Sequence, residues 1–175
     1  MIYKNLNRFR LLAVALTSRG FGYAVLEGEL SLIESGHSCM SGPKKNALTL
    51  AKVKKLMAMY QPGFMVLHSS GDSQRPRTKR LRTLYREIVG LAARENLAVE
   101  FVSDSELRCL LVDKQKGTKH ERAEMLAQRF PNELGLCVPA KRRLWQGNDA
   151  RMDLFDAVAL AVASGIKERV ALPWI

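Results

Sequence analysis

The stretch RMDLFDAVALAVASG, residues 151–165, contains the pattern that decides how this chain folds. From Ala157 to Ala163 every residue is apolar, which is typical of a helix that is buried on all sides. Asp153 and Asp156 precede this run three residues apart, so on a helix the two carboxylates share one face and repel each other. Asp is rarely buried without a partner. A bound cation, a basic side chain or exposure to solvent must therefore relieve the repulsion between them.

Segments on the N-terminal side of this helix predict the rest of the fold. Three short apolar segments separated by glycine-containing turns predict a meander of antiparallel strands over residues 10–17, 21–28 and 29–38. The spacing of apolar residues then predicts helices over 44–60, 78–96, 104–111 and 119–130, and strands over 64–68 and 97–103. Asp104 and Thr118 are the expected N-caps, and residues 131–149 are expected to be a loop. This order predicts a mixed sheet flanked by helices in one α/β domain.

The composition restricts the class of protein. The chain has 175 residues, 47% of them hydrophobic, which suits one globular domain with a sizeable core. Three scattered cysteines form no CxxC pattern, so a disulfide framework is not expected. Neither a transmembrane segment nor a signal peptide is apparent, and we therefore expect a cytoplasmic protein with no membrane partner. The formal charge of +11 favours a polyanionic partner, with nucleic acid ahead of an anionic membrane surface.

Two basic clusters are candidates for contacts with phosphates. Residues 75–86 contain six basic residues and no acidic one. Like charges at this density repel one another and favour an anionic partner whose binding weakens with salt. A second cluster lies at residues 141–145, where Trp145 either stacks on a base or anchors a loop to the core. The predicted nucleic-acid-binding residues are Arg75, Arg77, Lys79, Arg80, Arg82, Lys141, Arg142 and Arg143.

Four short motifs together resemble the RuvC family of Holliday junction resolvases, and most closely a RuvC-like branch of uncharacterised bacterial proteins. They are RLLAVALTSRGFGYAVLEG, GFMVLH, GTKHERAE and RMDLFDAVALAVA. In this order they resemble the family's first hairpin, its fourth strand, the segment that brings a lysine towards the active site, and its last helix. The resemblance implies a ribonuclease H-like fold whose mixed five-stranded sheet has three antiparallel strands followed by parallel ones. It implies one domain over residues 1–175, with a core over about 10–165 and a C-terminal tail over 166–175.

The resemblance also implies an acidic site for two divalent cations, of which this chain retains half. Asp153 and Asp156 match the two aspartates of the last helix, and Lys119 matches the lysine, so these three are the predicted catalytic residues. The aspartate of the first strand is replaced by Ala15 and the glutamate of the fourth strand by His68. Mg²⁺ prefers oxygen ligands, so Asp153, Asp156 and His68 are predicted to hold Mn²⁺ or Mg²⁺, or no metal at all.

Several alternatives stay open at the level of the residues. Asp153 and Asp156 could equally be exposed to solvent or paired with Arg151 or Lys119. His68 could be hydrogen-bonded to nearby backbone, and Lys119 could be a surface residue at a helix start.

Three functions compete. The first is a protein of RuvC-like fold with a degenerate site that binds branched or structured nucleic acid, with DNA favoured over RNA. The second is a metal-dependent endodeoxyribonuclease. The third is a structural subunit of a nucleoprotein complex, whose tail RVALPWI could anchor a partner. The resemblance implies a homodimer.

Overall fold

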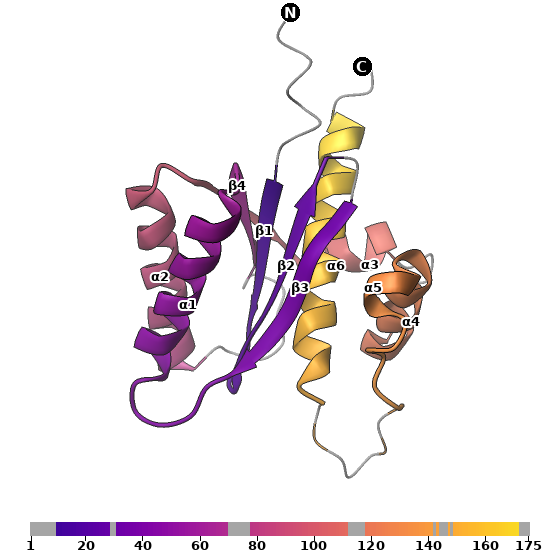
Figure 1. The fold of residues 1–175 in the computed structure, drawn as a ribbon, viewed down its shortest axis with the longest axis horizontal. Helices are drawn as coiled ribbons and strands as arrows, with labels where there is room; N and C mark the ends of the chain where they lie inside the picture. The colour runs from indigo at the N-terminus through magenta and orange to yellow at the C-terminus, as the bar shows by residue number, and fades with distance from the viewer. Residues whose placement is uncertain are drawn as a thin grey trace, which may run out of the picture.

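A single five-stranded sheet in the order β3-β2-β1-β4-β5 forms the centre of the molecule (Figure 1). The computed structural model describes residues 10–28, 31–69, 78–111, 118–141, 143, 147 and 149–171, without the side chains of residues 110 and 168–171. The strands are β1 (Arg10–Leu16), β2 (Gly20–Glu27), β3 (Ser31–Cys39), β4 (Phe64–His68) and β5 (Ala98–Val102). β1, β2 and β3 pair antiparallel, whereas β4 pairs parallel with both β1 and β5. The predicted mixed sheet is therefore confirmed.

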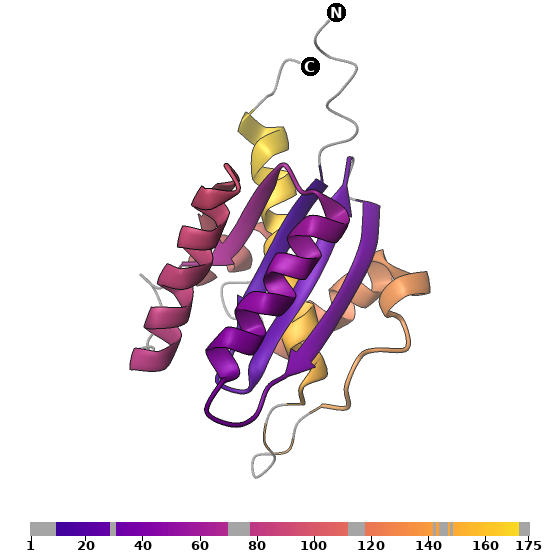
Figure 2. The same cartoon turned by 60° about the vertical axis from the view of Figure 1, so that its left-hand side comes forward.

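Helices cover both faces of this sheet. The bounds are α1 (Lys45–Tyr60), α2 (Lys79–Arg94), α3 (Asp104–Leu111), α4 (Lys119–Arg129), α5 (Pro131–Leu134) and α6 (Arg151–Ala171). One face is covered by α1 and α2, and the other by α6 with α3, α4 and α5 around it (Figures 1 and 2). Side chains of β1 alternate between the two cores, with Leu12 and Val14 beneath α1 and α2 and Ala13 beneath α6. No helix in the described part of the chain is long and apolar enough to cross a membrane.

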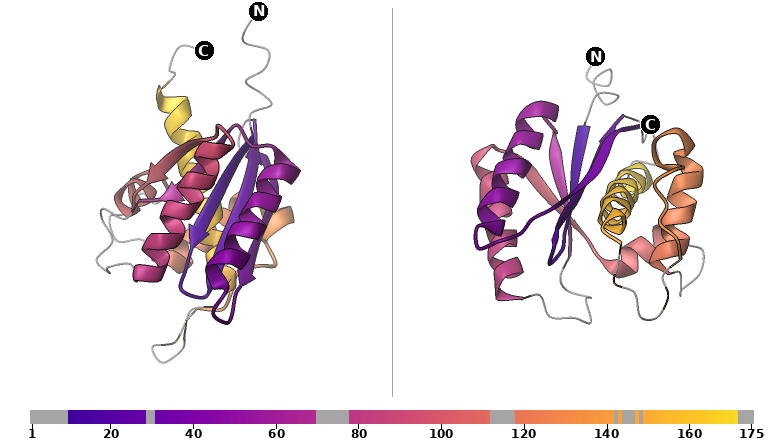
Figure 3. Two further views of the ribbon diagram at one scale, coloured as in Figure 1. Left: turned by 90° about the vertical axis from the view of Figure 1, so that its left-hand side faces the viewer. Right: turned by 60° about the horizontal axis from the view of Figure 1, so that its bottom comes forward.

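The last helix, α6, is buried as its sequence predicts. It lies between the sheet and α4 (Figure 3), and every side chain from Ala157 to Ser164 is at most 1% exposed. Its N-terminal end approaches β2 so closely that Gly22 has no room for a side chain. A Cβ at Gly22 would lie 1.8 Å from the carbonyl oxygen of Asp153. This contact fixes the first turn of α6 beside the hairpin formed by β1 and β2.

Three local predictions differ from the structure. Residues 131–134, expected in a loop, form the short helix α5, which begins at Pro131 because proline suits the first helical position. Residues 166–171, expected in a tail, continue α6, while 172–175 lie outside the described residues. The N-cap of α3 is Ser103 instead of Asp104. The hydroxyl of Ser103 accepts from the Glu106 amide at 3.2 Å, and the Glu106 carboxylate accepts from the Ser103 amide at 2.7 Å.

Candidate functional site

Asp153, Asp156, Lys119 and His68 come together at the edge of the sheet where β1 and β4 end. β1 and β4 are parallel, so their carboxyl ends lie at the same edge. Thr17, just beyond β1, donates from its hydroxyl to Oδ2 of Asp153 at 3.1 Å. The β1–β2 hairpin thus meets the first turn of α6. The structure therefore brings together residues that lie up to 136 positions apart in the sequence.

Asp153 is a buried carboxylate that the positive charges of Arg19 and Lys119 influence, although no ion pair joins it to a residue in the described part of the chain. Its exposed fraction is 5%, and its hydroxyl donor is Thr17. Burial raises the pKa of Asp153, the negative charge of Asp156 raises it further, and the hydrogen bond from Thr17 lowers it in part. The folded chain therefore disfavours a full negative charge at this position. Such an arrangement is common in functional sites, although structural networks also produce it.

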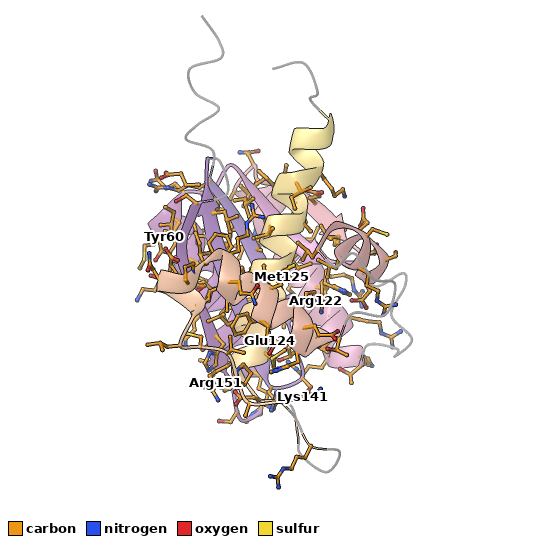
Figure 4. The ribbon with its side chains drawn as sticks, turned by 90° about the vertical axis from the view of Figure 1, so that its right-hand side faces the viewer. Tyr60, Arg122, Glu124, Met125, Lys141 and Arg151 are labelled. Carbon is orange, nitrogen blue, oxygen red and sulfur yellow. The ribbon has the colours of Figure 1, made fainter. Side chains whose placement is uncertain are left out.

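Asp156 is instead paired with two cations of α4. The ammonium Nζ of Lys119 lies 2.6 Å from Oδ2 of Asp156, and a guanidinium nitrogen of Arg122 lies 3.4 Å from Oδ1. Arg122 is buried, and it projects from the helix that covers α6 in Figure 4. The capping box formed by Thr118 and Glu121 makes Lys119 the first residue of α4, and this start of the helix lies beside Asp156. The charge of Asp156 is thus balanced by the protein's own side chains, and the predicted pairing with Lys119 is present.

The alternative pairing with Arg151 is absent from the ion pairs of the described residues. Arg151 binds Asp149, to which it donates from its amide at 2.9 Å and from its guanidinium at 2.7 and 3.1 Å. These hydrogen bonds lower the pKa of Asp149 to about 2. Asp149, just before α6, therefore binds the guanidinium of Arg151, the first residue of that helix.

His68, at the end of β4, forms a pair with Asp104 that the sequence did not indicate. The distance between Nε2 of His68 and Oδ1 of Asp104 is 3.1 Å, and both side chains are partly buried. The hydrogen bond with His68 is the main cause of a lowered pKa of Asp104, to which Arg122 and Lys119 also contribute. One signal in the sequence could have identified Asp104. Because the spacing of Ser103 and Glu106 forms the capping box of α3, the Asp104 carboxylate is not needed as a cap and is available for another contact.

Comparisons with known proteins bear on the fold. No protein-family model and no curated protein matches the sequence. The RuvC structure from Thermus thermophilus superimposes with a TM-score of 0.68 and 18% identity, covering 93% of this chain and 97% of that one. The chain has the fold of RuvC. The predicted ribonuclease H-like fold class is thereby confirmed.

Two complexes with DNA share this RuvC fold. T. thermophilus RuvC in complex with Holliday junction substrate matches with a TM-score of 0.69 and 13% identity, over 94% of this chain and 97% of that one. Fowlpox virus resolvase with Holliday junction DNA matches with a TM-score of 0.61 and 13% identity, over 91% and 99%. At such low identities these likenesses establish the fold alone.

The side chains at the site that the RuvC resemblance predicts do not fit a pair of divalent ions. Ala15 offers no ligand atom, His68 is bonded to Asp104, and Asp156 is occupied by Lys119 and Arg122. Among the described residues, no group of three or more His, Cys, Asp or Glu side chains is arranged to hold a metal ion. Binding of one ion by Asp153, Asp156 and His68 stays a prediction.

The predicted nucleic-acid-binding residues divide into three groups. Lys79 and Arg82, on the first turn of α2, and Lys141 and Arg143, after α5, are exposed. Arg80 is only partly exposed. Its guanidinium donates to Oδ1 of Asn46 at 2.8 Å and to the carbonyl oxygens of Thr17 and Ser18 at 3.3 and 3.1 Å, which ties α2 to α1 and to the β1–β2 turn. The third group, Arg75, Arg77 and Arg142, lies outside the described part of the chain, as does Trp145.

Proposed function

We propose that this chain binds branched DNA through the phosphate backbone and the shape of the junction, and that it holds its substrate without cutting it. The observation that carries the proposal is the pairing of Asp156 with Lys119 and Arg122 at the site that the RuvC resemblance assigns to metal ions. The resolved complexes of RuvC and of the fowlpox resolvase contain Holliday junction DNA, which makes a branched duplex the first ligand to test.

Charge balance supports binding without a metal. A divalent ion at Asp156 would lie within a few ångströms of two protein cations, a repulsive arrangement, and it would have to displace the ammonium group of Lys119. Mg²⁺ also requires several oxygen ligands in octahedral geometry, whereas Ala15 supplies none and His68 supplies a nitrogen. In this proposal Lys119 and Arg122 provide the positive charge that metal ions provide in a two-metal site.

Lys119 is suited to contact a phosphate while it remains paired. Its side chain is 56% exposed, and an ammonium group has three N–H donors, of which Asp156 accepts one. Lys79, Arg82, Lys141 and Arg143 supply further exposed positive charge. Neutralising phosphates with such groups releases counterions, so the affinity is expected to fall steeply with salt.

A second function, a metal-dependent endonuclease, is favoured by one observation. The buried Asp153, whose pKa is raised by burial and by Asp156, carries the unfavourable charge that a divalent cation would relieve. This function requires cleavage that depends on Mg²⁺ or Mn²⁺ and on Asp153. The homodimer implied by the resemblance is compatible with either function. For the third interpretation, a subunit anchored through the tail, residues 172–175 lie outside the described part of the chain.

Equilibrium binding in EDTA tests the proposal. A labelled four-way junction is compared with a duplex of the same length and sequence, and with a single-stranded RNA, by fluorescence anisotropy. We expect the junction to bind at least about tenfold more tightly than the duplex, a difference of 1.4 kcal/mol. Equal affinity for junction and duplex, or no binding of either at low salt, would overturn the proposal. Tighter binding of the RNA would assign the surface to another nucleic acid.

A further inference from the structure

The positive charge of the molecule is concentrated on one of its two helical layers. Helices α1 and α2 together contain nine Lys or Arg residues and a single acidic residue, Glu87. Helices α3 to α6, on the opposite face of the sheet, contain seven basic and eight acidic residues. Figure 2 shows α1 and α2 together on their side of the sheet. The net charge of the chain is therefore strongly asymmetric.

The exposed lysines of α1 form no ion pairs within the described part of the chain. Lys52, Lys54 and Lys55 of α1 are exposed, and none of them takes part in an ion pair with a described residue. Lys52 donates a hydrogen bond to the Ser38 hydroxyl of the neighbouring strand β3. Ion pairs with described residues therefore do not balance the mutual repulsion of these three lysines, and an anionic partner would relieve it.

The spacing along α2 increases this repulsion. Lys79, Arg82 and Arg86 lie three and four residues apart, so they share one face of the helix, and all three are exposed. Like charges at these separations on one face of a helix destabilise it. The described residues provide no carboxylate in an ion pair with any of the three.

We infer that the outer surface of this layer is a second phosphate-binding surface, which holds a duplex arm of the DNA. We define this α1–α2 face by six of the exposed cations of the two helices, namely Lys52, Lys54, Lys55, Lys79, Arg82 and Arg86. Lys79 and Arg82, in the first turn of α2, lie where this face meets the junction site. The inference rests on the proposed function, because it takes the partner to be branched DNA. It adds a surface on the opposite side of the sheet from Asp153, Asp156 and Lys119.

The geometry connects the α1–α2 face to the junction site. Arg80, in the first turn of α2, bonds to Asn46 in the first turn of α1 and to the turn that follows β1. Both helices therefore begin at the edge of the sheet that carries the site, and they run away from it. A helix of 16 residues is about 24 Å long. At 3.4 Å per base pair, an arm leaving the junction at that edge would lie along it for roughly seven base pairs.

The same face does not suit a membrane. A helix that inserts into a bilayer surface presents a continuous apolar face to the headgroup region. The large exposed apolar residues of α1 are Leu48 and Met59, with exposed fractions of 47% and 56%. They are eleven residues apart, which places them about 16 Å apart along the helix. Isolated apolar side chains among lysines favour a rigid, hydrated polyanion over a lipid surface.

Two charge-neutralised variants of the full chain test this inference. Lys54→Gln with Lys55→Gln removes two cations from the α1–α2 face, and Arg108→Gln with Arg129→Gln removes two exposed cations from α3 and α4 as the matched control. Glutamine keeps the helix propensity of lysine and arginine, so both variants are expected to fold. Affinity for the four-way junction is measured in EDTA over a range of salt concentrations.

We expect the α1 variant to bind more weakly, with the slope of log affinity against log salt reduced by about 2, and the control to match the unaltered chain. If the unaltered chain binds the junction but the α1 variant keeps its affinity and slope, the α1–α2 face is not a DNA contact and the proposed function survives. An equal loss in the control overturns the inference in the same way. Absence of junction binding by the unaltered chain overturns both. Loss of binding to phosphatidylserine vesicles, without loss of DNA binding, would assign the face to membranes.

Discussion

Asp153 and Asp156 lie on the same helix, but the protein accommodates their charges in opposite ways. Asp156 is neutralised by Lys119 and Arg122, whereas Asp153 is buried with a hydroxyl donor. The repulsion expected from their spacing is thus relieved at one residue and retained at the other.

Asp153→Asn is expected to raise the free energy of unfolding at pH 7. Because the pKa of Asp153 is raised in the folded chain, its ionised form is disfavoured there, and the charge destabilises the fold at any pH above that value. Asparagine removes the charge and keeps an acceptor for Thr17. Each kcal/mol gained would raise Tm by about 2–4 °C. Thermal unfolding at pH 7 and pH 4 should show a gain that shrinks in acid; a lower Tm at pH 7 would contradict this.

Asp104→Asn is expected to have the opposite effect. The pKa of Asp104 is lowered, first by its hydrogen bond with His68, so the ionised carboxylate stabilises the fold above the ordinary Asp pKa of about 3.9. This stabilisation is lost as the pH falls through the lowered pKa. Urea unfolding should therefore find the variant less stable at pH 7, with a difference that disappears in strong acid. A variant as stable as the unaltered chain at pH 7 would argue against the pair.

Removing each partner of Asp156 should cost different amounts. Arg122 is only 8% exposed in its side chain, so Arg122→Ala leaves a partly buried carboxylate with less compensation and should cost about 1–3 kcal/mol. The side chain of Lys119 is 56% exposed, and its pair with Asp156 is screened by solvent, so Lys119→Ala should cost under about 1 kcal/mol. Urea unfolding measures the loss of unfolding free energy in each variant. A larger loss in Lys119→Ala than in Arg122→Ala would show that Lys119 is the more important partner of Asp156.

At the scale of elements, the contact between α6 and β2 sets the position of the site. Gly22→Ala would place a Cβ 1.8 Å from the Asp153 carbonyl oxygen, so α6 must move, and we expect a loss of about 3 kcal/mol or more. Gly90→Ala is the matched control, because nothing lies within 4 Å of its Cβ and alanine favours the helix by about 1 kcal/mol. Thermal unfolding should therefore show a lower Tm for Gly22→Ala and a higher Tm for Gly90→Ala. A Gly22→Ala variant as stable as the unaltered chain would exclude the close contact.

The elements were largely predictable because their signals are local. The apolar run from Ala157 to Ala163 identified α6, and Thr118 with Glu121 identified the start of α4. The N-cap of α3 was assigned one residue too late, because Asp104 and Ser103 are both good capping residues. The reciprocal hydrogen bonds between Ser103 and Glu106 show that Ser103 is the cap. Short local patterns thus locate elements better than they locate the ends of elements.

The contacts of the site were less predictable because they join distant segments. Lys119 and Asp156 are 37 residues apart, and His68 and Asp104 are 36 apart, with no local pattern that indicates either pair. The RuvC resemblance implied that Lys119 lies near Asp156, and their ion pair was one of the alternatives left open at the level of the residues. Neither indicated the pair of His68 and Asp104. Arg80 looked like one more surface cation of its cluster, but its guanidinium is directed to carbonyl oxygens of the β1–β2 turn. Only the packing of α1, α2 and that turn places these acceptors beside it.

At the scale of the whole molecule, the asymmetric charge and the RuvC fold suit a protein that contacts branched DNA with two of its surfaces. The layer of α1 and α2 is strongly basic, while the layer of α6 balances its charges internally. In the proposed function, the layer of α6 binds the junction, and the α1–α2 face binds one of its duplex arms. The central claim is that the site acts through its own cations, without metal ions.

The most direct measurement is binding and cleavage of a labelled four-way junction in EDTA, in Mg²⁺ and in Mn²⁺. The unaltered chain is compared with Asp153→Asn and with Ala15→Asp combined with His68→Glu, which restores the two carboxylates implied by the RuvC resemblance. We expect the unaltered chain to bind the junction in EDTA, to bind it no more tightly in either metal at matched ionic strength, and to leave it intact. Cleavage by the unaltered chain in Mg²⁺ or Mn²⁺, lost in Asp153→Asn, would contradict it and establish a working nuclease.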